Sequence, residues 1–244
     1  MWTLSENLAL LSLGPLNVQI DLTHVERGLD EIRIAGHGWE NARLLSVRLP
    51  SRTSEEPLAP LESYVRGTDL VAIYPSLPPY TIQSQIYWRA RQQPSLSAIG
   101  VELIVSVQTS QLYSEPQTPI WSTIPDALGA LIWMPGDQPR TFVPTPLPRT
   151  LSAARGDHGI VACGIPGTNQ VYVEMIHPSD LDAMNVEAAD GGVRVSAEVF
   201  QEHLEKGVIR RARVCGWLVP AADWQRRAWS LYESYRLEHP PLTA

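Results

Sequence analysis

The stretch IGVELIVSVQ, at residues 99–108, carries the pattern that decides the fold of this chain. Apolar residues occupy every second position from Ile99 to Val107, with small or polar residues between them and Ile104 as the one break. Successive side chains of a β-strand point to opposite faces, so this period of two predicts a strand with one face on a core and the other in water.

The same type of segment recurs along the chain. Residues 16–22 and 171–175 repeat the alternation, and eight more segments have the composition of strands: 29–35, 42–49, 69–74, 82–90, 130–134, 158–163, 192–200 and 208–219. About eleven strands separated by turn signals favour an all-β fold over a parallel α/β sheet. We therefore predict a large antiparallel two-sheet sandwich.

Helical periodicity is confined to the end of the chain. From Trp224 to Tyr235 apolar residues recur at i, i+4, i+7 and i+11, and Asp223 before them is a candidate N-cap. This pattern predicts one C-terminal α-helix over about 221–238, docked on the sandwich and ended before Pro240-Pro241. A short helical turn is also expected at Ser179.

Proline marks the irregular parts of the chain. Of 21 proline residues, 15 lie between Pro50 and Pro148. Because each proline removes a ladder donor, we expect residues 50–60, 75–79 and 135–148 to be ordered surface loops. Residues 138–149 would be the linker if there were two domains, but no composition shift crosses them, and we predict a single domain over 1–244.

Composition limits the classes of function. The chain of 244 residues is 44% hydrophobic with a net charge of −7, which suits a globular protein and argues against nucleic-acid binding. Its mean hydropathy of −0.11 and the lack of an apolar run of about 18 residues argue against a membrane protein. The N-terminal residues lack a cationic region and a cleavage site, so we expect a cytoplasmic protein.

Cysteine and the basic residues add two observations. Cys163 and Cys215 have no metal-binding spacing, so we expect buried thiols, no metal site and no cofactor. All basic residues except Lys206 are arginine. Two explanations are open for this skew. One is the base composition of the genome, and the other is a preference for planar groups that bind carboxylates in bidentate fashion.

A first group of candidate functional residues lies in residues 172–180. Tyr172 and Glu174 share one strand face, and His177 follows at the end of the strand, so Glu174 and His177 are candidates for an acid/base pair. His158, which lies between glycines, is a weaker catalytic candidate. The alternative is that Glu174 pairs with an arginine while His177 and Asp180 cap the turn.

A second group is the polar stripe of residues 83–91, in which five consecutive outward positions bear hydrogen-bonding side chains. Such a stripe could hold a hydroxyl-rich or carboxylate ligand, with Tyr87 stacking and Arg89 bidentate. The alternative is a solvated edge or a cross-strand charge ladder with Glu102. In residues 206–213, strand alternation separates the arginines, which favours ion pairs over nucleic-acid binding. The predicted ligand-binding residues are Gln85, Tyr87, Arg89, Arg91, Glu102, Tyr172, Glu174, Arg211 and Arg213.

The N-terminal segments GPLNVQID, at residues 14–21, and RGLDEI, at 27–32, resemble the first hairpin of galactose mutarotase-like sandwich proteins. This resemblance implies a large two-sheet sandwich with a concave face that binds sugars. It also implies that enzymatic relatives use His and Glu to move a proton. No residue of this chain matches the histidine motifs or the catalytic glutamate of the family, so no catalytic role is carried over.

Three functions are compatible with these patterns. We favour a non-enzymatic sandwich that binds a carbohydrate or another small polar molecule on one sheet face. The alternatives are a sugar-active, epimerase-like enzyme that uses Glu174 and His177, and a scaffold that forms a homo-oligomer through its exposed strands and C-terminal helix. We expect neither nucleic acid nor a membrane as a partner.

Overall fold

The computed structural model describes residues 1–54, 56–79, 81–125, 132–136, 141–189 and 192–239. Parts of several predictions lie outside these residues, including residue 55 of the predicted loop 50–60. The others are the first two positions of the predicted strand 130–134, residues 137–140 of the predicted loop 135–148, residues 138–140 of the linker, and Pro240-Pro241 after the helix.

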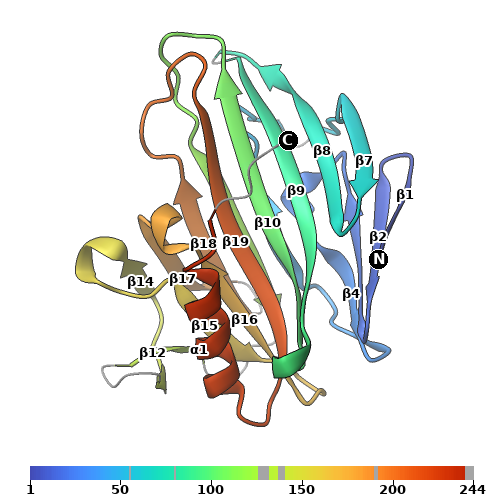
Figure 1. Cartoon of the computed structure of the whole chain (residues 1–244), viewed down its shortest axis with the longest axis vertical. Helices are drawn as coiled ribbons and strands as arrows, with labels where there is room; N and C mark the ends of the chain where they lie inside the picture. Colours follow the sequence, from blue (N-terminus) through green and yellow to red (C-terminus); the bar gives the residue numbers. More distant parts are fainter. Residues whose placement is uncertain (55, 80, 126–131, 137–140, 190–191, 240–244) are drawn as a thin grey trace.

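The first layer of the molecule is a nine-stranded antiparallel sheet (Figure 1). Its strands are, in spatial order, β13 (Phe142–Pro144), β12 (Trp133–Pro135), β15 (Ile160–Gly164), β16 (Gln170–Ile176), β19 (Ile209–Pro220), β10 (Ala98–Thr109), β9 (Ile82–Gln93), β8 (Asp69–Leu77) and β7 (Glu62–Arg66).

The second layer consists of two five-stranded antiparallel sheets. The first contains β1 (Trp2–Ser5), β2 (Leu8–Leu13), β3 (Leu16–Asp21), β4 (Asp30–Ile34) and β5 (His37–Gly38) in this order. The second has the order β14 (Arg149–Ser152), β17 (Ala183–Ala189), β18 (Gly192–Val199), β11 (Thr118–Pro125) and β6 (Arg43–Val47). A bridge between Leu29 and Leu44 joins the two sheets at their facing edges. The predicted all-β sandwich is confirmed, with its second layer divided in two.

The hydrophobic core lies between the layers, as the alternation in residues 99–108 predicts. Val101, Leu103, Val105 and Val107 of β10 belong to a buried cluster that includes residues of all three sheets. Ile104, the break in the pattern, faces the opposite side, where it packs in a small buried cluster of its own. Each large apolar side chain buried in this way contributes about 1.5–3 kcal/mol to folding.

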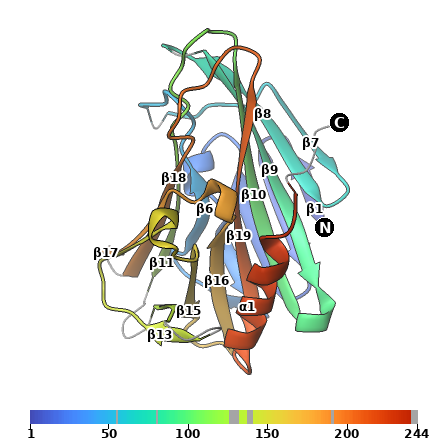
Figure 2. The same ribbon diagram turned by 60° about the vertical axis from the view of Figure 1, so that its left-hand side comes forward.

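Helix α1 (Trp224–Tyr235) packs on the outer face of the nine-stranded sheet, over β16 and β19 (Figure 2). The predicted helix is confirmed with narrower bounds, but its predicted cap is wrong. Asp223 has a left-handed backbone (φ 54°, ψ 25°) and its side chain caps no backbone N–H, whereas an N-cap needs extended backbone. The turn expected at Ser179 is a 3-10 helix over Pro178–Asp180. None of the helices among the described residues is long and apolar enough to cross a membrane.

The structure contains more strands than the sequence predicts. All eleven predicted segments contain strands, and the eight others among the described residues are β1, β2, β5, β7, β11, β13, β14 and β17. Some predicted proline loops are also strands. Pro75 lies in β8 where the pairing with β9 shifts register, and Pro144 lies in the edge strand β13. At such positions the missing ladder donor costs little.

Candidate functional site

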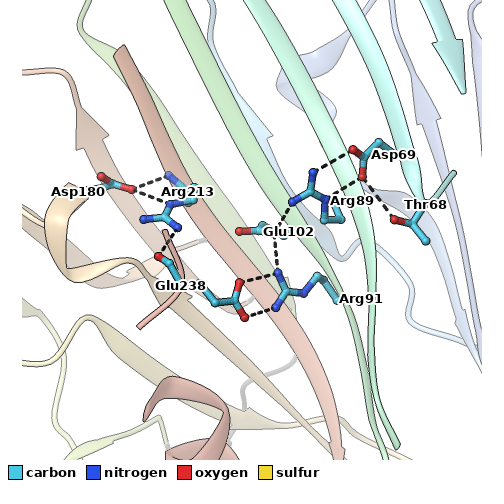
Figure 3. Close-up of polar contacts among 8 residues, drawn as sticks. All are labelled: Thr68, Asp69, Arg89, Arg91, Glu102, Asp180, Arg213 and Glu238. Atoms are coloured by element: carbon cyan, nitrogen blue, oxygen red, sulfur yellow. Dashed lines mark hydrogen bonds and ion pairs between the residues drawn. The ribbon is translucent and has the colours of Figure 1, made fainter. Parts of the chain in front are cut away.

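An ion-pair network covers part of the outer face of the nine-stranded sheet (Figure 3). Arg89 of β9 donates two hydrogen bonds to Asp69 of β8, of 2.8 and 2.9 Å. Arg91 donates to Glu102 of β10 at 2.9 Å and binds Glu238 in bidentate fashion. The polar stripe of residues 83–91 therefore contains a cross-strand ladder with Glu102, which was one of the two alternatives.

The network continues across β19 to the segment that follows helix α1. Arg213 lies 3.7 Å from Asp180 and donates a hydrogen bond of 3.0 Å to the backbone carbonyl of Glu238. Glu102 is 1% exposed, and burial raises its pKa while Arg91 and Arg89 oppose the rise. Burial also raises the pKa of Asp180, although Ser179 and Arg213 oppose the rise. A ligand on this face would have to replace existing ion pairs.

Three other predicted binding residues lie on the same face. Strand register places Gln85 and Arg211 on either side of Ser106, and Tyr87 one row further along. Tyr87 is buried against Ile104, so its ring is not available for stacking at the surface.

Tyr172 and Glu174 lie on the opposite face of the sheet, between the layers. The Glu174 carboxylate accepts hydrogen bonds from Tyr172, at 2.6 Å, and from Ser122 of β11. Gly216 leaves the space for this arrangement, because a Cβ atom there would lie 2.6 Å from the Tyr172 hydroxyl. Burial raises the pKa of Glu174 to about 7, although the bonds from Ser122 and Tyr172 oppose the rise. This cluster joins the two layers.

The structure does not bring Glu174 and His177 together. The side chain of His177 lies on the helix side of the sheet, with its ring 5.4 Å from that of Tyr235 and its Nδ1 bonded to Ser179. Burial, aided by Arg213, lowers the pKa of His177 to about 4. His158 packs against Trp229 and Tyr232 of α1, which is also on the helix side. Residues three apart on a strand face opposite sides, which explains the separation of Glu174 from His177.

A cleft that the sequence analysis did not predict lies on the outer face of β18, β11 and β6. Its volume is about 730 Å³. We call it the arginine cleft. The described residues that line it are His24, Glu26, Arg27, Arg43, Arg48, Arg52, Thr53, Ser54, Trp121, Thr123 and Arg194.

Strand alternation builds the floor of the arginine cleft. Ile120, Ser122 and Ile124 of β11 face the interior, so Trp121 and Thr123 face outward. Thr123 is paired with Arg194 of β18 on one side and with Arg43 of β6 on the other. The walls come from residues 24–27 and 48–54.

Most guanidinium groups of the cleft form no ion pair within 4.0 Å with a described residue, although the charges of Arg27 and Arg43 act on Asp30 and the strand register places Glu187 opposite Arg194. Arg48 and Arg194 lie 5.7 and 5.1 Å from the centroid of the Trp121 ring. In the part of the chain that the structure describes, no carboxylate comes within 4.0 Å of these two arginines, nor of Arg27 and Arg43. The cleft therefore has an excess of positive charge.

Arg52 forms the buried end of the cleft. Its guanidinium lies 3.5 Å from Glu26 and donates a 3.0 Å hydrogen bond to the Ser54 carbonyl. Its Nη1 is buried and has no hydrogen-bond partner within the described structure. An unsatisfied buried donor is costly for the folded state.

The signal for this cleft in the sequence is weak. Arg43, Arg48 and Arg52 occur within ten residues, but no motif links them to Trp121 or Arg194. Among the described residues, no group of three or more His, Cys, Asp or Glu is placed to hold a metal ion.

No protein-family model matches the sequence, and no curated protein matches it. Solved structures match in fold. A putative aldose 1-epimerase from Escherichia coli K12 aligns with a TM-score of 0.60 over 86% of this chain and 98% of its own, at 9% identity. A putative aldose 1-epimerase from Klebsiella pneumoniae aligns with a TM-score of 0.53 over 94% of this chain and 83% of its own, at 10% identity. An alpha-N-acetylgalactosaminidase from Bifidobacterium bifidum, in complex with GalNAc, gives 0.52 over 96% of this chain and 39% of its own, at 10% identity. The chain therefore has a galactose mutarotase-like fold, as the N-terminal resemblance implies.

Proposed function

We propose that the protein binds a carbohydrate or another small polar molecule in the arginine cleft and catalyses no reaction on it. The cleft itself carries the proposal: about 730 Å³ is the size of a small-molecule site, and its floor combines an aromatic ring with a hydroxyl and guanidinium groups. The structural neighbours named for sugar epimerases and a glycosidase agree with a sugar ligand.

The polar groups of the cleft suit recognition of hydroxyl groups. Thr53, Ser54 and Thr123 present side-chain hydroxyls, and the arginines present planar N–H donors. Trp121 is 9% exposed, so only part of its indole is available to an apolar sugar face. A few directional donors around an aromatic surface are typical of sites for small polar ligands.

Binding without catalysis is favoured because the acid/base groups of the cleft are already engaged. Among its described residues the only carboxylate is Glu26, which faces Arg52, and the only imidazole is His24. His24 Nδ1 lies 3.0 Å from Asp21, whose pKa is lowered because hydrogen bonds from Thr23 and His24 outweigh the effect of burial. The epimerase-like alternative depended on Glu174 and His177, which lie on opposite faces of the sheet. Self-association stays a prediction.

A steric block of the cleft tests the proposal without regard to ligand charge. Thr123→Phe places a ring on the floor between Arg43 and Arg194, and Arg89→Gln is the control on the other outer face. Isothermal titration against a panel of neutral and acidic sugars and organic acids should give a ligand whose affinity falls at least about tenfold in Thr123→Phe and stays unchanged in Arg89→Gln. If the panel gives no ligand, or if Arg89→Gln alone weakens binding, the proposed site is wrong.

A further inference from the structure

We infer that the ligand of the arginine cleft is an anionic monosaccharide, one whose hydroxyl groups are accompanied by a carboxylate or a phosphate. The inference rests on the proposed function and makes it more specific. It identifies the charge of the ligand, on which the fold alone has no bearing.

The charge of the cleft is opposite to that of the chain. The protein as a whole has a net charge of −7, yet the described lining of the cleft contains five arginines and one glutamate. Like charges that face one cleft repel each other, and an anion among them removes that repulsion.

Several arginines without an ion pair line this one cleft, whereas the other described arginines without one, such as Arg33, Arg66, Arg149 and Arg227, lie outside it. Elsewhere in the described structure arginines pair readily with carboxylates, as Arg89, Arg91 and Arg213 do within the network and Arg155, Arg210 and Arg236 do at the surface. With 26 acidic residues in the chain, partners are plentiful. The cleft arginines are therefore in a position to provide their donors to a ligand.

The strand register lets two of these arginines reach one anion. Arg43 and Arg194 flank Thr123 on the two neighbouring strands, so their backbones are separated by two strand spacings, roughly 10 Å. Arginine side chains are long enough to converge across that distance on a carboxylate or phosphate, which they bind in bidentate fashion.

The size of the cleft favours a small anion over a polymer as its ligand. About 730 Å³ accommodates a monosaccharide with its charged group, and the acidic surface elsewhere repels a long polyanion such as nucleic acid.

Titration with matched probes tests this inference. Galactose, galacturonate, galactose 6-phosphate and inorganic phosphate are each titrated calorimetrically into the wild type and into an Arg43→Gln/Arg194→Gln variant, with Arg210→Gln as the control. Both charged sugars should bind the wild type at least about tenfold more tightly than galactose, and more weakly as salt rises from about 50 to about 300 mM. The double variant should lose that preference, and Arg210→Gln should keep it.

Each other outcome has a definite meaning. Equal affinity for galactose and the charged sugars overturns the inference and leaves the proposed function standing. Absence of binding by all the sugars overturns the inference, and the proposed function falls only if the wider panel of sugars and organic acids also gives no ligand. Phosphate that binds as tightly as galactose 6-phosphate also overturns the inference, because the sugar then contributes nothing. Since Arg43 and Arg194 make no ion pairs within the described residues, the double variant should fold, and an unchanged thermal midpoint verifies this.

Discussion

The two outer faces of the sandwich use arginine in opposite ways. On the nine-stranded sheet, Arg89, Arg91 and Arg213 each face a carboxylate (Figure 3). In the arginine cleft on the other layer, Arg43 and Arg194 form no ion pair within 4.0 Å in the described part of the chain, although Glu187 lies opposite Arg194 and Asp30 is affected by the charge of Arg43. The residue type is the same, but the location of the acidic groups differs.

This difference separates stability from binding. A buried ion pair is costly to break, because removing one member leaves the other as a buried charge without a partner. An exposed arginine without a partner contributes little to folding and keeps its donors for a ligand. Mutations in the ion-pair network on the nine-stranded sheet, which we call the paired face, should therefore lower stability. Mutations in the arginine cleft should weaken ligand binding instead.

The largest expected effect is on the paired face. Arg213→Met should lower the free energy of unfolding by about 3–5 kcal/mol, because Asp180 would lose its cationic partner in a buried setting. Arg210→Met on the same strand removes only a surface pair with Glu202 and should cost less than about 1 kcal/mol. Urea denaturation measures both values. Similar losses in the two variants would show that burial of the pair does not matter.

An intermediate effect is expected from Glu174, a buried carboxylate with hydroxyl partners instead of an arginine. The folded protein retains this proton up to a pKa of about 7, whereas an unfolded glutamate releases it near 4.5. The folded state thus binds more protons between these values, and the contribution of Glu174 to stability falls as pH rises through this window.

Glu174→Gln mimics the protonated form and removes this dependence. The stability of the variant relative to wild type should rise by on the order of 3 kcal/mol between pH 4.5 and pH 7, and level off above it. The pKa of His177 is lowered, so its contribution to stability has the opposite pH dependence and decreases as the pH falls. Both proteins contain His177, so this contribution cancels in the comparison. A difference that does not change with pH would contradict this assignment.

The smallest effect is expected in the cleft. Arg43→Gln should change the free energy of unfolding by less than about 0.5 kcal/mol, because the side chain is exposed and makes no ion pair with a described residue. Any change at low salt reflects the balance between repulsion among the arginines and attraction to Asp30, and it should vanish as salt is added. Thermal melts at two salt concentrations measure it. A loss above about 1 kcal/mol would mean that Arg43 has a structural role.

The strands follow from local sequence because alternation is a local property. Residues 99–108 predict β10 together with its buried face, and residues 83–91 predict which side chains of β9 share a side. Strand β11 escapes prediction because Pro119 and Pro125 lie near its ends. It provides Trp121, so the floor of the cleft was missed with it.

Combining faces from different strands requires the register, which the sequence does not specify. Arg89 is paired with Glu102, Glu102 with Cys215, and Cys215 with Met175. Arg89, Glu102, Cys215 and Met175 therefore lie side by side with their side chains on the outer face of the sheet. Glu174, the neighbour of Met175 in the strand, points to the inner face. A predicted site that joined Arg89 to Glu174 therefore contained residues of both faces. The arginine cleft was inaccessible for a related reason: its parts come from four segments that only the fold brings together.

The attachment of the segment after helix α1 has one more consequence. Glu238 supplies its side chain to Arg91 and its carbonyl to Arg213, so it serves as an internal counter-ion for the nine-stranded sheet. A chain shortened after Tyr235 would leave Arg213 with Asp180 alone and Arg91 with Glu102 alone. The sheet would keep one carboxylate for each of the three arginines of the network, but it would lose the bidentate attachment that holds the end of the chain against it.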